Sequence, residues 1–117
     1  MAESLMLEKS KDFAVDIVFL CKNIKTHYNE SILTNQLIRC ATSIGANIHE
    51  ANYGQSRADF ISKLQISLKE CYESEYWLEL LCRVNYINEE TYKDFRQKCG
   101  VIRRMLISSI NTTKKNS

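Results

Sequence analysis

Charged and polar side chains form a regular line on a stretch of sequence that is otherwise apolar. Arg39, Ser43, Asn47 and Glu50 follow one another at spacings of four, four and three residues. That spacing places all four side chains on one side of an α-helix. A guanidinium, a hydroxyl, an amide and a carboxylate in one line could form a ligand pocket or a carboxylate active site.

A second polar line, further along the chain, offers partners for the first. Three of its residues share one side of a helix: Ser67, Glu70 and Ser74. Glu73 lies beside them. Two polar lines inside one helical protein are expected to meet, because an unpaired buried polar group costs about 1–3 kcal/mol. Arg39 would then pair with Glu70 or Glu73.

We favour a structural polar network over an active site, because such a network fixes helix register and subunit pairing. Its predicted members are Arg39, Ser43, Asn47, Glu50, Glu70 and Glu73. A di-metal carboxylate centre needs Glu-x-x-His, and neither His27 nor His49 has a glutamate three positions before it. No GxSxG, GxGxxG or phosphate-binding loop occurs. The sequence therefore predicts no enzyme, metal or cofactor, and an enzyme built on Glu50, Glu70 and Arg39 is the least favoured alternative.

Positive charge is concentrated in the last quarter of the chain. The 117 residues carry 16 Lys and Arg against 14 Asp and Glu, a net charge of only +2. That excess alone does not indicate nucleic-acid binding. Residues 88–117 contain more basic than acidic side chains, and four of the basic ones are candidate phosphate contacts: Lys93, Arg96, Arg103 and Arg104. A solvated helix face with a frayed tail is the plainer interpretation.

Aromatic residues gather near these cations. Some lie at helical spacing, and others flank the turn before the last basic segment: Tyr72, Tyr76, Trp77, Tyr86, Tyr92 and Phe95. Aromatic rings interleaved with Lys and Arg can stack on single-stranded bases. At helical spacing, core or interface packing is the more common role.

The cysteines and the N-terminus indicate a reducing compartment. Five cysteines occur, with no CxxC and no secretion signal, so neither disulfides nor a zinc site is expected. Each cysteine falls among periodic apolar residues and is expected to be a small buried hydrophobe. No stretch is apolar enough to span a bilayer. We therefore expect a cytoplasmic protein with no membrane partner.

Hydrophobic periodicity predicts one domain, residues 1–117, made of four helices. Their expected ranges are 4–26, 31–53, 57–84 and 89–112. Short connections favour an antiparallel up-down-up-down bundle. The second helix has few charges and is expected to be buried on most sides, with Gly45 allowing a close neighbour. Ser56 and Asn88 are expected N-caps, and Gly54 suits a C′ position.

Residues 36–51, QLIRCATSIGANIHEA, resemble the signature helix of the four-helix-bundle protein family. These bacterial proteins were first noticed as reading frames inside intervening sequences of large-subunit ribosomal RNA genes. The resemblance continues through 55–64, 66–70 and 73–81, with a weaker echo at 9–14. At Cys40-Ala41 the family commonly has Ser-Gly, a change that keeps the residues small.

The resemblance implies a four-helix up-down bundle that assembles as a homopentamer with a central channel. The sequence is similar also to the accessory protein of diversity-generating retroelements, a basic pentamer that binds nucleic acid and a reverse transcriptase. We therefore expect a non-enzymatic oligomer that binds RNA or DNA through its last helix. The alternative is a protein–protein interaction scaffold without a nucleic-acid role.

Overall fold

Four α-helices and no strand make up the part of the chain that the computed structural model describes, residues 2–116. The helices are α1 (Ala2–Tyr28), α2 (Ile32–Ala51), α3 (Arg57–Arg83) and α4 (Glu89–Lys115). Their ends differ from the expected ranges by at most three residues, which is within the usual uncertainty of helix termini. The predicted all-α class is confirmed.

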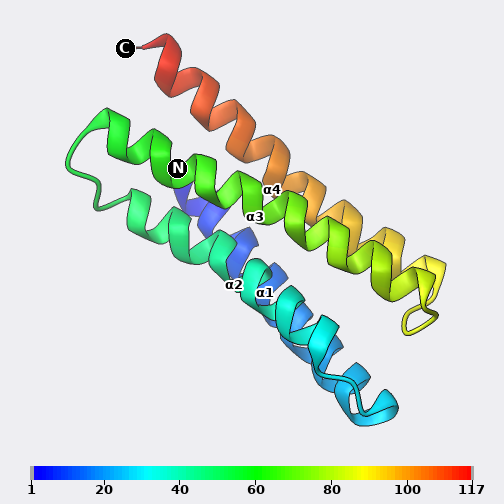
Figure 1. Cartoon of the computed structure of the whole chain (residues 1–117). Helices are drawn as coiled ribbons and strands as arrows, with labels where there is room; N and C mark the ends of the chain where they lie inside the picture. The colour runs from blue at the N-terminus through cyan, green and yellow to red at the C-terminus, as the bar shows by residue number, and fades with distance from the viewer. Residues whose placement is uncertain (1, 117) are drawn as a thin grey trace.

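Each helix packs on the helix that follows it in sequence. α2 lies between α1 and α3, α4 packs on α3, and α1 contacts α4 less extensively. Figure 1 shows an α1–α2 pair and an α3–α4 pair that diverge towards the α1–α2 and α3–α4 turns. The molecule is elongated, with extents of 48 × 22 × 20 Å. Within residues 2–116 no helix is both long and apolar enough to cross a membrane.

One apolar side of every helix builds the core, as the periodicity predicted. The predicted core residues that are buried include Phe13, Ile17, Ile24, Leu37, Ile44, Ile48, Leu64, Cys71, Leu78, Phe95, Cys99, Ile102, Leu106 and Ile110. Full burial of a Leu, Ile or Phe side chain stabilises a fold by about 1.5–3 kcal/mol. All five cysteines carry free thiols, and only Cys82 among them is partly exposed.

The expectation that the second helix is buried on most sides is wrong for this chain. The buried residues of α2 form a single side, which includes Leu37, Ile44 and Ile48. Thr42 and Ala46 are exposed on the other side. Within one chain, the low charge of α2 therefore reflects small, uncharged residues on its exposed side and does not reflect burial in the core.

Gly45 lets α1 and α2 approach closely, as predicted. A Cβ atom added at Gly45 would lie 3.3 Å from Cβ of Ser10 on α1. Ser10 is fully buried, and its hydroxyl donates to the Met6 carbonyl at 2.8 Å. The contact joins two atoms close to the two backbones, so neither can swing aside.

The helix caps at Ser56 and Asn88 follow the prediction, and a further cap that the sequence did not predict begins α2. The Ser56 hydroxyl accepts from the Asp59 amide at 3.1 Å, and the Asn88 side chain accepts from the Thr91 amide at 2.7 Å. At the start of α2 the Glu30 carboxylate provides the cap instead of Ser31, since it accepts from the Leu33 amide and, at 3.2 Å, from the Thr34 amide.

Gly54 does not have the left-handed backbone expected at a C′ position, because no glycine in residues 2–116 has a positive φ. Its small size is what the turn needs. An added Cβ would lie 3.1 Å from the Ala51 carbonyl oxygen and 3.3 Å from the Phe60 amide nitrogen.

Candidate functional site

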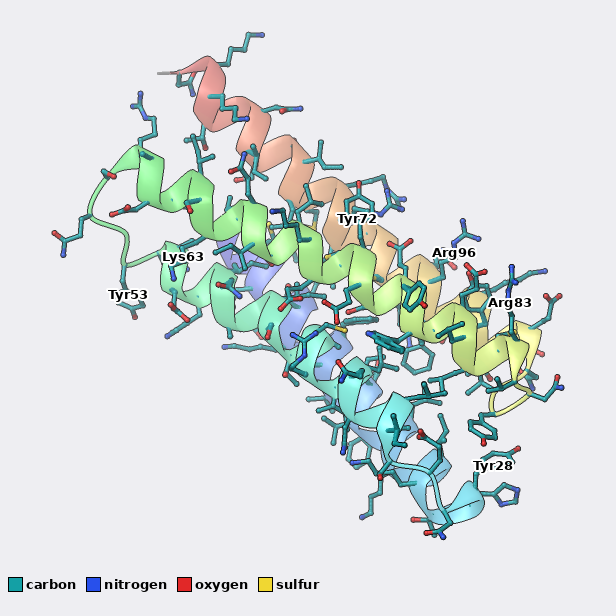
Figure 2. All side chains as sticks on the ribbon, in the orientation of Figure 1. Tyr28, Tyr53, Lys63, Tyr72, Arg83 and Arg96 are labelled. Atoms are coloured by element: carbon teal, nitrogen blue, oxygen red, sulfur yellow. The ribbon has the colours of Figure 1, made fainter. Side chains whose placement is uncertain are left out.

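The outer face of α4 carries the cations that the sequence singled out. Lys93, Arg96 and Arg104 are exposed, and none of the three has an ion pair within residues 2–116. Figure 2 shows the Arg96 side chain pointing away from the bundle. Positions 93, 96 and 104 fall on one side of a 3.6-residue helix. α4 therefore presents three unneutralised cations to solvent on a common face, with Lys114 and Lys115 exposed at its end.

Arg103, the fourth predicted cation, is engaged within the chain. Its Nε donates to the Glu75 carboxylate at 3.0 Å, and its guanidinium lies 5.8 Å from the Tyr72 ring centroid. The hydrogen bond to Glu75 is the largest effect on Arg103 and raises the pKa of its guanidinium. A bidentate or stacked arginine that is already neutralised has little charge left for a phosphate. We therefore separate Arg103 from the open cations of α4.

Arg39 pairs with both carboxylates that the sequence offered. Its guanidinium contacts the Glu73 carboxylate directly and lies 3.6 Å from the Glu70 carboxylate. Trp77 donates its ring N–H to Glu73 at 3.1 Å. These contacts tie α2 to α3. About half of the Arg39 side chain is exposed, however, so the pair lies at the surface of the chain and not in its interior.

The two carboxyl groups of this cluster differ in pKa. Burial raises the pKa of Glu70 above its ordinary value, and the nearby Arg39 only partly offsets the effect. Burial would raise the pKa of Glu73 as well, but hydrogen bonds from Trp77 and Arg39 outweigh it and lower that pKa. Glu73 is thus the carboxylate that Arg39 and Trp77 hold in its charged form.

Of the remaining predicted members of the polar network, Ser43 contacts the ion cluster, and Asn47 and Glu50 bond elsewhere. The Ser43 hydroxyl donates to the Arg39 carbonyl at 2.8 Å, and the Asn47 amide donates to the Ser43 carbonyl at 2.8 Å. Glu50 instead pairs with Lys63 of α3 at 3.0 Å. Ser43 also hydrogen-bonds to the Glu70 carboxylate, so the predicted line divides into a cluster of Arg39, Ser43, Glu70 and Glu73, the Asn47 amide bonded to its own helix, and the separate Glu50–Lys63 ion pair.

Beneath this cluster, buried hydroxyls of α3 complete the contact with α2. The Ser67 hydroxyl donates to the Ile44 carbonyl at 2.7 Å, and the Ser74 hydroxyl lies 3.3 Å from the Cys40 sulfur. Every buried side-chain nitrogen and oxygen in the described residues has a hydrogen-bond partner. The arrangement is that of satisfied helix–helix contacts, with each polar group bound within the fold.

Sequence reasoning did not find two features of the structure. Glu75 was not identified as the partner of Arg103. The second is a stacked ring pair, Tyr28 and Tyr86, whose centroids lie 4.4 Å apart across the gap between α1 and the α3–α4 turn. The aromatic composition pointed to Tyr86, but nothing in the local spacing connects it with a tyrosine 58 positions earlier in the sequence.

The helix order and the polar contacts define a small all-α protein of four helices. Comparison with protein-family models matches residues 2–108 to the 23S rRNA-intervening sequence protein family. The chain belongs to that family. The resemblance noted from residues 36–81 is thereby confirmed.

A solved relative has the same fold. It is a crystal structure, from Bacteroides thetaiotaomicron, of a protein of unknown function from the S23 ribosomal protein family. The two sequences are 48% identical over 95% of this chain and 99% of that chain, with a TM-score of 0.93. No protein among those with curated descriptions matches the chain.

Proposed function

We propose that this protein is a non-enzymatic, homo-oligomeric four-helix bundle that binds RNA or DNA through the open cations of α4. The observation that carries the proposal is the common exposed face of Lys93, Arg96 and Arg104, three cations without an ion pair in residues 2–116. Exposed lysine and arginine side chains on a helix can contact phosphates, and such contacts carry no direct sequence information. Binding of this kind is sensitive to salt and tolerant of sequence.

A net charge of +2 on one chain gives only a weak attraction for nucleic acid, and assembly increases the positive charge by repeating the cations. We propose an up-down-up-down bundle that forms a homopentamer, so each cation of α4 occurs five times around a ring. The exposed side of α2 supports a subunit contact. Its charged residues Arg39 and Glu50 are neutralised within the chain, and Thr42 and Ala46 beside them are small. A face whose charges are already paired avoids the cost of burying an unpaired ion at a subunit contact.

The binding test compares two double variants that remove the same amount of charge. Arg96→Gln/Arg104→Gln removes cations from the proposed face, whereas Lys9→Gln/Lys69→Gln removes exposed cations of α1 and α3. We expect the α4 variant to weaken binding of structured RNA and to reduce the slope of log K against log salt by about 1 for each phosphate that is no longer bound. Equal affinities for the two variants would contradict the proposal, as would a wild-type Kd above about 100 μM at low salt.

The assembly test is the solution mass by light scattering, at low and high salt. A mass of five subunits is expected, and a monomer would overturn the assembly part of the proposal. Asn47→Leu and Glu50→Leu are expected to change the assembled mass or the melting temperature. The first removes the amide bonded to Ser43 and the second removes the partner of Lys63. Wild-type values for both variants would contradict a role in assembly.

A second candidate function is a scaffold that binds another protein, such as a reverse transcriptase, without a nucleic-acid role. The observation that favours it is a set of exposed apolar residues on α1, with Phe19 61% and Val15 52% exposed. Solvent-exposed aromatic and branched side chains on one helix are typical of partner surfaces. A pentamer whose mass does not change with RNA, and which no longer binds a protein partner in Phe19→Ser, would favour this function over the first.

A further inference from the structure

The cleft between the end of α1 and the α3–α4 turn has the chemistry of a nucleotide site. It is a groove of about 1130 Å³, open to solvent, between the end of α1 and the α3–α4 turn. The α1–α2 and α3–α4 pairs diverge in this region (Figure 1). α1 contributes Lys22, Asn23 and Tyr28 to its lining, and the turn and the start of α4 contribute Tyr86 and Asn88. We propose that this cleft binds one unpaired nucleotide, with the base stacked on the Tyr28–Tyr86 pair.

The aromatic pair supplies a flat surface that is already ordered. The Tyr28 and Tyr86 rings are stacked, with an interplanar angle of 26°, and His27 packs edge-on against Tyr28. The Tyr28 hydroxyl donates to the Asn85 carbonyl at 3.3 Å, which holds the ring across the gap. Tyr28 is 41% exposed, so part of the pair is open to the cleft. Bases stack on such rings whatever their sequence, because every base has a π-face.

The polar lining suits the edges of a base. Asn23 makes no side-chain hydrogen bond within the described residues, so its amide can both donate and accept. Asn88 uses its side-chain oxygen to cap the Thr91 amide, which leaves its NH₂ group as a donor. Asparagine amides match the paired donor and acceptor groups of base edges. The backbone of Asn85, with φ of 64°, turns the chain at this edge of the cleft.

Charge selects an anionic ligand over a cation. Lys22 is the charged residue among the lining residues, and no Asp or Glu lines the cleft. The smaller cleft of about 430 Å³ at the α2–α3 turn differs in this respect, since Glu50 and Asp59 line it. A phosphate attached to the base would therefore find a cation at the α1 side of the larger cleft, whereas a metal ion would find no carboxylate.

The cleft lies at the N-terminal end of α4, one turn or less from the first cation of the proposed phosphate-binding face. Thr91 lines the cleft, whereas Lys93, two residues later, lies on nearly the opposite side of α4, so a strand must pass around this end of the helix to reach both. A single strand that follows α4 with its phosphates could place one unpaired base in the cleft. This part of the inference rests on the proposed function, whereas binding of a free nucleotide in the cleft is independent of the proposed function.

The test compares Tyr28→Ala with Tyr53→Ala. Tyr53 is a matched control because its ring makes an edge-type contact with the His49 ring, as the Tyr28 ring does with His27, but it lies at the other end of the bundle (Figure 2). The probes are single-stranded oligoadenylate, its duplex with the complementary strand, and adenosine monophosphate. We expect wild type and Tyr53→Ala to prefer the single strand. Tyr28→Ala should lose about 5-fold to 100-fold in single-strand affinity and show little change for the duplex.

Further readouts keep the inference open to refutation if Tyr28→Ala folds poorly. Tyr28→Phe keeps the ring and should retain the single-strand preference. In the wild-type protein, amide NMR signals of Asn85 and Asn88 should shift with the single strand. Saturable shifts with adenosine monophosphate as well would assign the site to free nucleotides, and shifts with the polymer alone would assign it to an unpaired base. No shift with either probe overturns the inference.

Failure of this inference is distinguishable from failure of the proposed function. If Arg96→Gln/Arg104→Gln weakens binding of both nucleic acids but Tyr28→Ala matches Tyr53→Ala, the α4 face stands and the nucleotide cleft is refuted. If wild type binds neither nucleic acid but adenosine monophosphate shifts the signals of Asn85 and Asn88, the α4 proposal is refuted and the cleft stands as a mononucleotide site.

Discussion

Gly45 provides a sharp test of how closely α1 and α2 are packed. An added Cβ would lie 3.3 Å from Cβ of Ser10, an atom fixed to the backbone of a fully buried residue. A valine also adds two methyl groups at that point. Overpacking of this kind costs about 1–3 kcal/mol, and the better helix propensity of valine over glycine returns only a few tenths of that. Gly45→Val should therefore destabilise the protein.

The matched control is the same substitution at Gly100, another mid-helix glycine. A Cβ at Gly100 would meet only the guanidinium ends of Arg103 and Arg104, each at 3.3 Å. Both contacts lie at the far ends of long side chains. Arg104 has no ion pair in the described residues and can move aside, and Arg103 needs to shift by only a few tenths of an ångström. Gly100→Val should therefore stay within about 1 kcal/mol of wild type, because the propensity gain offsets the displacement of the two arginines.

Thermal unfolding at one fixed protein concentration measures the difference. For a chain of this length about 1 kcal/mol corresponds to roughly 3–6 °C in Tm. Gly45→Val should then melt about 3–15 °C below wild type, and Gly100→Val close to it. The concentration is held constant because assembly would make Tm depend on it. Equal melting temperatures for the two valine variants would refute the close contact between Ser10 and Gly45.

Three further results are expected. Glu30→Ala should lower the free energy of unfolding by about 1 kcal/mol in a denaturant titration, because it removes the acceptor for the Leu33 and Thr34 amides, whereas Ser31→Ala should leave it unchanged. Glu73 has a pKa lowered in the folded state, so its contribution is present above its unfolded pKa and is lost as pH falls. Glu73→Gln should therefore lose less stability than wild type between neutral and acidic pH, and an equal or greater loss would contradict this. A thiol reagent should modify Cys82 first in the native protein, because burial raises the pKa of Cys21 to about 12 and that of Cys40 to about 11; rapid native reaction of all five thiols would be inconsistent with that burial.

Periodicity along one chain predicted which side of each helix enters the core. It worked because burial is decided by the 3.6-residue repeat, as at Phe95, Cys99 and Ile102. The caps at Ser56 and Asn88 were predictable for a similar reason, since each bonds to an amide three residues away. Local spacing sufficed wherever the interaction itself was local.

Contacts between helices were harder to predict. For Arg39, the sequence left two candidate partners, because the positions of both carboxylates on α3 matched the position of the arginine. The ion pair between Arg103 and Glu75 was not predicted, because each of these two residues had several possible partners. The prediction that α2 is buried on most sides was wrong for a different reason. A shortage of charge indicates burial only when large apolar residues replace the charges, and Thr42 and Ala46 are small.

The order in which the helices pack has a consequence for how the chain folds. α1, α2 and α3 each contact the next helix along, across connections of a few residues. Among the described residues, the less extensive α1–α4 contact joins the first helix to the last. Short loops cost little entropy to close, so proteins with mainly local contacts fold in microseconds to milliseconds. We expect the α1–α4 contact to form last and to open first, which makes the outer two helices the part of the bundle most readily released when the chain unfolds.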